Sequence, residues 1–277
     1  MPDKGRELID CVDPYEYEGA GFIACLDSGM GGISVLTDIR RLLPQEDFIY
    51  FGDIANAPYG DKDTDQVQQI VLDQVNTLLT WKLKALILAC NTATSVTVAQ
   101  LRNLLDIPVF GLEPALKPAV KECMGRIVVL GTTLTLREKK FTNLLSKLSE
   151  ARDIITLPCP GLMELIEEDP QQIAIGEYLQ KILLPYKNNL DGIVLGCTHY
   201  LFLKQLLKRL LPNVLIFDGN EGIAKQCKSV MEQEGLLGSG TGQLLFLSSL
   251  ENKDAEGHEL FVDKCWKFYD FYEAMVD

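Results

Sequence analysis

The chain has 277 residues, of which 47% are hydrophobic and 23% are charged, a mixture typical of a globular protein that buries a sizeable core. A formal net charge of −13 with no basic stripe argues against a nucleic-acid partner, because such binding depends on clustered lysine and arginine. The acidic N-terminal segment lacks an apolar signal core, and no apolar run approaches the roughly 20 residues that span a bilayer. We therefore expect a cytoplasmic protein without a membrane partner.

Short β-branched runs alternate with longer segments of helical period from Gly21 onward. Apolar residues recur every three or four positions in segments such as ISVLTDIRRLL and LFLKQLLKRLL, which indicates helices. The apolar runs have the composition of buried parallel strands. This alternation predicts a doubly wound α/β architecture. The expected strands are GFIACL (21–26), DFIYF (47–51), ALILA (85–89), IPVFG (107–111), RIVVLG (126–131), DIITL (153–157), GIVLG (192–196) and VLIF (214–217).

The polar ends of these strands repeat at a nearly constant offset. Asp27 and Gly131 are 104 residues apart, and Cys90 and Cys197 are 107 residues apart. This repetition predicts two similar doubly wound parallel-sheet domains with an active site in the cleft between them, since ligands bind beyond the carboxyl ends of parallel strands. We expect an N-terminal extension over 1–20, a first domain over 21–113 completed by 219–277, and a second domain over 114–218.

The stretch DSGMGG, from Asp27 to Gly32, follows a strand and opens a helix. Its glycines suggest a loop whose backbone N–H groups approach an anion. The dinucleotide fingerprint fails, however, because its last glycine would fall at position 34, which is Ser34. The stretch is equally compatible with a tight turn in which Asp27 or Ser28 caps the helix.

Two cysteines follow expected strands, Cys90 in ACNTAT and Cys197 in GCTHY. A single buried cysteine is usually an inert core residue, and the eight cysteines of the chain show no CxxC spacing. Two thiols from two similar halves can nevertheless approach one carbon from opposite sides, which is what stereoinversion by an acid and a base requires. Two alternatives remain at this point: a zinc site made of these thiols with Asp27 and His199, and a Cys–His nucleophile.

The sequence contains five motifs in this order: DSGMGGISV (27–35), YFGDIANAPYG (50–60), ACNTAT (89–94), PALKPA (114–119) and GCTHY (196–200). In order and spacing they resemble the motifs of bacterial glutamate racemases, within the Asp/Glu racemase superfamily. Together they extend over most of residues 21–220, and NTAT and CTHY are closer to the glutamate enzymes than to the aspartate ones. Leu201 departs from the proline that commonly follows GCTHY, and LTLREKKF departs from the usual pattern after Thr132 and Thr133.

The resemblance implies an isomerase that interconverts L- and D-glutamate without a cofactor or metal and supplies D-glutamate for peptidoglycan, and so for cell-wall biogenesis and cell shape. It implies that Cys197 deprotonates L-glutamate and Cys90 deprotonates D-glutamate, with Asp27 assisting Cys90, and with His199 and Glu167 assisting Cys197. It also implies a homodimer and, given the extension over 1–20, activation by a peptidoglycan precursor. The implied substrate contacts are Ser28, Pro58, Tyr59, Gly60, Asn91, Thr92, Thr132 and Thr198.

Two other functions stay open from sequence. One is a racemase or isomerase of another small dicarboxylic acid, such as aspartate. The other is a metal- or anion-binding α/β protein without turnover.

Overall fold

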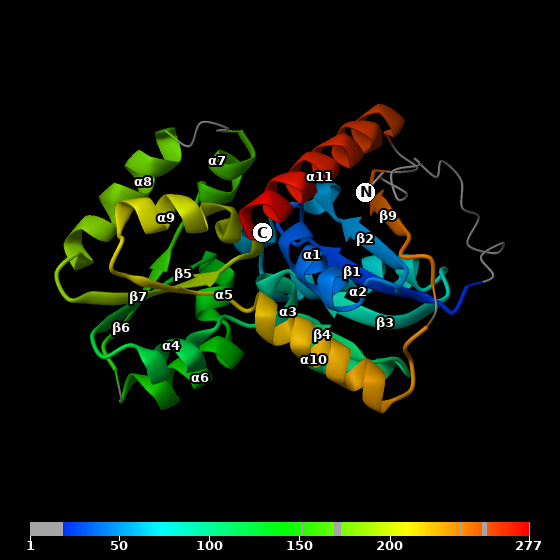
Figure 1. The fold of residues 1–277 in the computed structure, drawn as a ribbon, viewed down its shortest axis with the longest axis horizontal. Helices are drawn as coiled ribbons and strands as arrows, with labels where there is room; N and C mark the ends of the chain where they lie inside the picture. The colour runs from blue at the N-terminus through cyan, green and yellow to red at the C-terminus, as the bar shows by residue number, and fades with distance from the viewer. Residues whose placement is uncertain (1–18, 151, 169–172, 239, 251–253, 277) are drawn as a thin grey trace.

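The computed structural model describes residues 19–150, 152–168, 173–238, 240–250 and 254–276. All but the last two residues of the expected N-terminal extension lie outside these ranges. The described chain forms two parallel β-sheets with helices on their faces (Figure 1). The α/β architecture expected from the sequence is therefore confirmed.

The first sheet has five strands in the order β4-β3-β1-β2-β9, and all neighbouring pairs are parallel. Its central strand β1 is buried along its whole length because both faces of the sheet are covered by helices. The edge strand β9 comes from the C-terminal part of the chain and was not among the expected runs. The strands are β1 (Phe22–Asp27), β2 (Phe48–Gly52), β3 (Leu83–Leu88), β4 (Val109–Gly111) and β9 (Leu244–Ser248).

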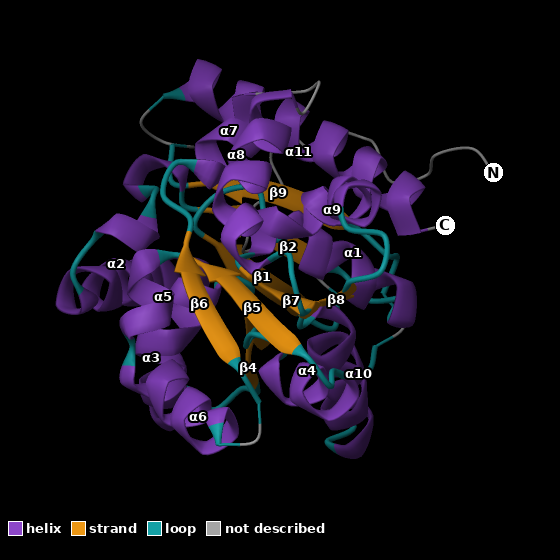
Figure 2. Ribbon diagram, turned by 90° about the vertical axis from the view of Figure 1, so that its left-hand side faces the viewer, coloured by secondary structure: helices purple, strands orange, loops and turns teal. Residues whose placement is uncertain are grey.

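The second sheet repeats this arrangement with four parallel strands in the order β6-β5-β7-β8. The view onto it in Figure 2 shows α7, α8 and α9 on one side and α4 and α6 on the other. Each of the eight expected strand runs corresponds to one strand of the two sheets, although β4 is shorter than the run that predicted it. The strands are β5 (Arg126–Gly131), β6 (Ile154–Pro158), β7 (Leu190–Gly196) and β8 (Leu215–Phe217).

The helices pack on these sheets through apolar faces. One face of the first sheet is covered by α1, α10 and α11, and the other by α2 and α3. Three-residue 3₁₀ turns occur at 54–56, 59–61 and 184–186, and a longer one covers Thr198–Leu203, where the sequence predicted α-helix from 201. The α-helices are α1 (Ile33–Leu42), α2 (Thr64–Leu78), α3 (Asn91–Leu104), α4 (Leu116–Glu122), α5 (Thr133–Arg137), α6 (Lys139–Ser149), α7 (Leu162–Glu168), α8 (Ile173–Leu183), α9 (Lys204–Leu210), α10 (Asn220–Gln233) and α11 (Ala255–Val276).

Helix α11 contacts the cores of both halves (Figure 1). Phe261 and Cys265 in its first part are buried against the first sheet, whereas Tyr272 near its end is buried in the core of the second. The Phe268 ring between them packs edge-on against Phe202, with 4.8 Å between the ring centroids. This one helix therefore bridges the two halves. Among the described residues, no helix is long and apolar enough to span a bilayer.

Candidate active site

The candidate site residues follow the carboxyl ends of strands in both sheets. Asp27 ends β1, and Cys90 lies two residues beyond β3 as the N-cap of α3. From the second sheet, Thr132 follows β5 and Cys197 follows β7. The carboxyl ends of parallel strands share one edge of a sheet, so each half presents its polar residues at one edge.

Cys90 is a buried thiol in an environment that keeps it protonated. Its Sγ lies 3.6 Å from Ser28 Oγ, and it accepts a hydrogen bond from the Ala93 N–H at 3.5 Å. Burial, together with the nearby Asp27 carboxylate and Cys197, raises the pKa of the Cys90 thiol to about 12, although the hydrogen bonds with Ala93 and Ser28 act in the opposite direction. Cys90 is therefore protonated at neutral pH, the form in which a thiol can serve as an acid.

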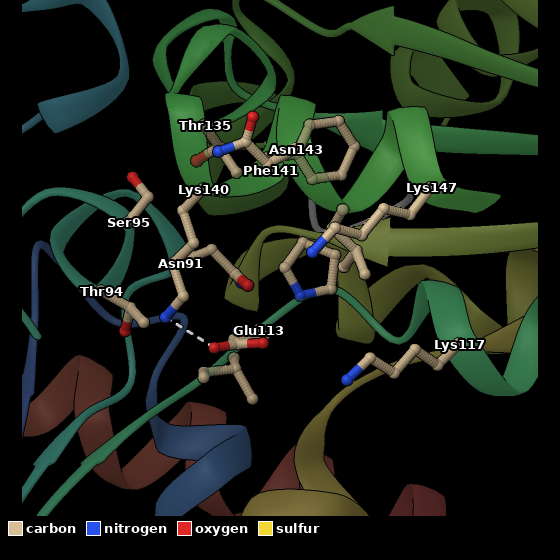
Figure 3. Close-up of a pocket in the computed structure, with 13 residues that line it drawn as sticks. Asn91, Thr94, Ser95, Glu113, Lys117, Thr135, Lys140, Phe141, Asn143 and Lys147 are labelled. Atoms are coloured by element: carbon tan, nitrogen blue, oxygen red, sulfur yellow. Dashed lines mark ion pairs between the residues drawn. The ribbon is translucent and has the colours of Figure 1, made fainter. Parts of the chain in front are cut away.

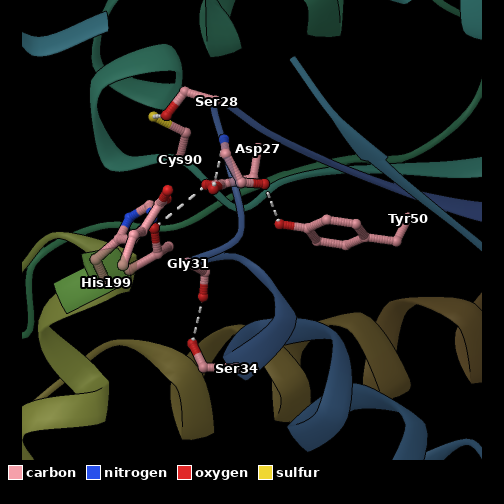
Figure 4. A network of polar contacts seen from close by, with 10 residues as sticks. Asp27, Ser28, Gly31, Ser34, Tyr50, Cys90 and His199 are labelled. Atoms are coloured by element: carbon pink, nitrogen blue, oxygen red, sulfur yellow. Dashed lines mark hydrogen bonds and ion pairs between the residues drawn. The ribbon is translucent and has the colours of Figure 1, made fainter. Parts of the chain in front are cut away.

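Asp27 lies fully buried behind Cys90. Burial raises the pKa of this carboxyl group, while the charge of His199 and hydrogen bonds from Gly32, Gly29 and Thr198 partly offset the effect. Figure 4 shows Asp27 with Ser28, Cys90 and His199 on one side of it and Tyr50 on the other. The Asp27 carboxylate therefore lies close enough to Cys90 to disfavour negative charge on its sulfur.

His199 forms a buried pair with Glu167 next to Cys197. Its Nε2 lies 2.9 Å from Glu167 Oε1, and its side chain is 1% exposed, against 25% for Glu167. Burial alone would lower the pKa of His199, but hydrogen bonds with Cys197 and Glu167 outweigh it and raise the pKa to about 10. Burial would raise the pKa of Glu167, but the hydrogen bond and the charge of His199 more than compensate, so the pKa of Glu167 is lowered overall. His199 is therefore an imidazolium at neutral pH, and a cation in contact with the Cys197 sulfur stabilises negative charge there.

The glycine-rich loop after β1 touches the second half of the molecule. A Cβ atom at Gly31 would overlap Thr198 Oγ1 and His199 Nδ1, and one at Gly29 would lie 3.4 Å from His199 Cε1. The loop is held from within the first half by Tyr50, whose hydroxyl donates to the Gly29 carbonyl at 2.7 Å. The absence of side chains at Gly29 and Gly31 therefore allows the His199 segment to approach Asp27.

A second group of expected residues meets where α3, the end of β5 and the segment around Tyr59 come together. Thr92 Oγ1 lies 3.0 Å from Thr132 Oγ1 and 3.0 Å from Thr135 Oγ1, which joins α3 to the end of β5. A Cβ at Gly60 would lie 2.7 Å from Thr132 Cβ, so the segment around Tyr59 packs directly against Thr132. The Tyr59 hydroxyl donates to Asp53 Oδ2 at 2.6 Å, and Pro58 precedes Tyr59 at the start of the 3₁₀ turn.

Sequence reasoning missed three residues that hold this arrangement. Tyr50 and Asp53 lie in or just after β2, where the first has the pattern of a core residue and the second that of a turn residue. Thr135 lies inside an apolar helical stretch. No spacing rule singles out these positions, because their partners are distant in sequence.

Asn91 faces a different environment from its neighbours. Its side chain is 5% exposed and lines a pocket between α3 and α6 (Figure 3). Within the described part of the chain, neither its amide nitrogen nor its amide oxygen has a hydrogen-bond partner.

The zinc alternative finds no matching geometry. Among the residues that the structure describes, no three His, Cys, Asp or Glu side chains are grouped so that they can hold a metal ion.

Comparison with known proteins points in one direction. Residues 35–227 match the Asp/Glu/Hydantoin racemase family. The chain is 44% identical over 241 residues to a glutamate racemase of Clostridium botulinum (strain Hall), covering 84% of this chain and 93% of the relative. It is also 44% identical to a glutamate racemase of Clostridium novyi (strain NT), covering 84% and 92%.

Solved structures of glutamate racemases have the same fold. The RacE1 isoform from Bacillus anthracis superimposes with a TM-score of 0.74 at 33% identity, covering 83% of this chain and 88% of that one. The Escherichia coli enzyme, in complex with L-glutamate and the activator UDP-MurNAc-ala, gives 0.73 at 28% identity, covering 82% and 98%. The chain therefore belongs to the Asp/Glu/Hydantoin racemase family, and within it to the glutamate racemases.

Proposed function

We propose that the protein interconverts L- and D-glutamate by a two-base mechanism in which Cys90 and Cys197 act on opposite faces of the α-carbon. The observation that carries this proposal is the position of the two thiols. They follow strands of different sheets, each has its own assisting groups, and the Cys197 sulfur lies close enough to Cys90 to contribute to the raised pKa of the Cys90 thiol. The proposed role is to supply D-glutamate for peptidoglycan synthesis.

The charged groups beside Cys90 differ from those beside Cys197. This difference supports a catalytic pair made of one thiol and one thiolate. In the direction from L- to D-glutamate, the Cys197 sulfur beside the His199 imidazolium takes the proton from the α-carbon. The carbanion then takes a proton from the Cys90 thiol on its other face, which leaves Cys90 as the thiolate. The reverse direction exchanges the two roles, so proton count and charge balance without a cofactor. Such a pair titrates as a unit.

Hydroxyl and backbone donors near the two thiols are the proposed substrate contacts. Ser28, Thr92, Thr132 and Thr198 offer hydroxyl groups, and we assign to Asn91 its backbone N–H at the first turn of α3. The N-terminus of a helix favours an anion because its first N–H groups lack partners within the helix. Pro58, Tyr59 and Gly60 complete the proposed set of substrate contacts. These donors give local attraction for a dicarboxylate despite the net charge of −13.

We further propose a cytoplasmic homodimer that a peptidoglycan precursor activates. The activator in the Escherichia coli structure, UDP-MurNAc-ala, supports a precursor of this type. The seven cysteines within the described ranges are all free thiols, which fits a reducing compartment.

Deuterium exchange tests the proposed function directly. The full chain is incubated with L-glutamate in D₂O containing a chelator and no added cofactor, and optical rotation and Cα deuterium are followed. We expect rotation to decay to zero while deuterium enters the α-position. Retained rotation with no deuterium would overturn the proposal. Equal rates on L-aspartate would instead favour the broader dicarboxylic acid alternative.

A further inference from the structure

Tyr200 is the last residue of the GCTHY motif and, unlike the three residues before it, has no part in the proposed function. Its side chain is 1% exposed and packs in the apolar core of the second half, in the same cluster as Cys159 and Cys197. A buried phenol needs a hydrogen-bond partner, because its bonds with water are lost. The Tyr200 hydroxyl donates to the Cys159 carbonyl, with 3.3 Å between the two oxygen atoms.

The backbone of Tyr200 is tied to the proposed base. Its N–H group donates to the Cys197 carbonyl at 3.1 Å, which closes the first turn of the 3₁₀ helix over Thr198–Leu203. Cys197 itself is extended, with φ −143° and ψ 140°, so the chain turns directly after the thiol. The two residues inside this turn carry the hydroxyl that bonds Asp27 and the imidazole that bonds Glu167. A shift of the turn would therefore disturb both contacts and the position of the thiol.

The side chain of Tyr200 joins the ends of two strands that are not neighbours. Cys159 follows β6 and is held to the sheet, because its N–H donates to the Gly131 carbonyl at the end of β5 at 3.0 Å. Cys197 follows β7, and Figure 2 shows β5 between β6 and β7. Two strand spacings amount to roughly 10 Å, which a tyrosine side chain and its hydrogen bond can bridge. Tyr200 therefore spans the end of β5 and links the segment after β7 to the segment after β6.

The 3₁₀ helix that begins after Cys197 needs support from outside. Hydrogen bonds in a 3₁₀ helix have poor geometry, and runs longer than three or four residues are uncommon. This one has six residues, Thr198–Leu203. Its position therefore depends on contacts with the rest of the second half, and the Tyr200 hydroxyl supplies one close to the thiol.

We propose that Tyr200 is a positioning residue for racemisation, which fixes the turn that carries Cys197 and His199. This inference rests on the two-base function proposed above. Tyr200 acts through the backbone of the turn and not by contact with the reacting atoms. Without its hydroxyl the turn gains freedom, and the contacts of His199 with Cys197 and Glu167 weaken.

Tyr200→Phe tests the proposal, because it removes the hydroxyl and keeps the ring in the core. We expect kcat for racemisation to fall about 10-fold to 10²-fold, as small displacements of catalytic groups can produce. We also expect the His199 ring to titrate at lower pH in NMR spectra. Its pKa is raised, against the effect of burial, by hydrogen bonds with Cys197 and Glu167, and these weaken when the turn shifts. A loss of general stability alone would not move this titration.

Tyr178→Phe is the matched control. The Tyr178 hydroxyl donates to the Pro160 carbonyl at 3.1 Å, so this variant removes the same group from the same end of β6. Tyr178 belongs to α8, however, and not to the turn after Cys197. Urea unfolding first shows that both variants are folded. The control should then keep the kcat and the His199 titration of the wild-type chain.

Three results would each overturn the proposal: an unchanged kcat in Tyr200→Phe, an unchanged His199 titration in that variant, or an equal change in Tyr178→Phe. If the wild-type chain leaves L-glutamate unchanged in D₂O, the proposed function fails instead. The titration of His199 is measured without turnover, so it still decides whether Tyr200 holds the turn.

Discussion

Thr198 of the second half donates a hydrogen bond to Asp27 of the first, with 3.3 Å between Thr198 Oγ1 and Asp27 Oδ1. Thr198 is the residue next to Cys197, and Asp27 raises the pKa of Cys90. A side chain adjacent to one thiol is thereby bonded to the carboxyl group that acts on the other. The relative position of the two halves and the protonation of Cys90 are therefore linked.

Replacing either proposed acid–base thiol should abolish most turnover. Cys90→Ser and Cys197→Ser should each lower kcat for racemisation by about 10² to 10⁴-fold, because a hydroxyl is a far weaker acid than a thiol and is not ionised to act as a base near neutral pH. Racemisation is measured by optical rotation from both enantiomers. Cys227→Ser is the control, since this thiol lies in the core under α10. A full rate in either active-site variant would rule out the two-base scheme.

The Glu167–His199 pair should determine how the stability of the folded enzyme falls at alkaline pH. Because the folded pKa of His199, about 10, lies above its ordinary value of 6.5, the stability from this imidazolium is fully present below pH 6.5. It is lost as pH rises through about 10. Glu167→Gln removes one of the groups that raise the pKa of His199, so this pKa should fall and the alkaline loss should begin at lower pH.

NMR titration of the histidine ring protons measures this directly, because the chain has only two histidines. The signal of His258 is assigned with His258→Gln. Urea unfolding of both proteins from pH 6.5 to 10 should show a weaker pH dependence for Glu167→Gln. An unchanged His199 titration in that variant would contradict the pairing.

The lack of a side chain at Gly31 should be what allows the two halves to pack closely. In Gly31→Ala, the new methyl group overlaps Thr198 and His199, so the halves must separate or His199 must move. We expect kcat to fall by about 10²-fold, as small displacements of catalytic groups can produce, and the free energy of unfolding to fall by about 1–3 kcal/mol. Gly222→Ala is the matched control, because a Cβ there meets nothing within 4 Å. Equal activity of the two variants would show that the contact at Gly31 does not matter.

Tyr50 should contribute to stability through one hydroxyl group. Tyr50→Phe leaves the buried Gly29 carbonyl without this donor, so the free energy of unfolding should fall by about 1–3 kcal/mol in urea titrations. Tyr186→Phe serves as the control, since that ring is only partly buried. A loss confined to Tyr50→Phe, together with a lower kcat, would indicate that the loop position also matters for catalysis.

The sequence predicted the strands well where composition and spacing agree. The eight β-branched runs form β1 to β8, and the motifs after β1, β3 and β7 meet at the junction of the halves. The edge strand β9 was missed because its run LLFLS is rich in leucine, which suits a helix as well as a strand, and because its partner β2 lies about 200 residues away.

The sequence predicted which residues form the candidate site but not which of them are in contact. Spacing could place Thr198 and Asp27 at strand ends, but not the bond between them, which depends on how the two sheets are joined. The unpartnered Asn91 amide is likewise invisible in the motif ACNTAT. Its environment is set by α6 and by the connection between β4 and α4.

The return of the chain to the first sheet through β9 and α11 has a consequence for synthesis. The four strands of the second sheet are complete by Phe217, whereas the first sheet receives its edge strand only at Leu244–Ser248. A nascent chain is therefore able to finish its second half before its first, and until then β2 presents an open edge to other strands. The first half, whose synthesis begins first, is therefore the last to receive all its strands.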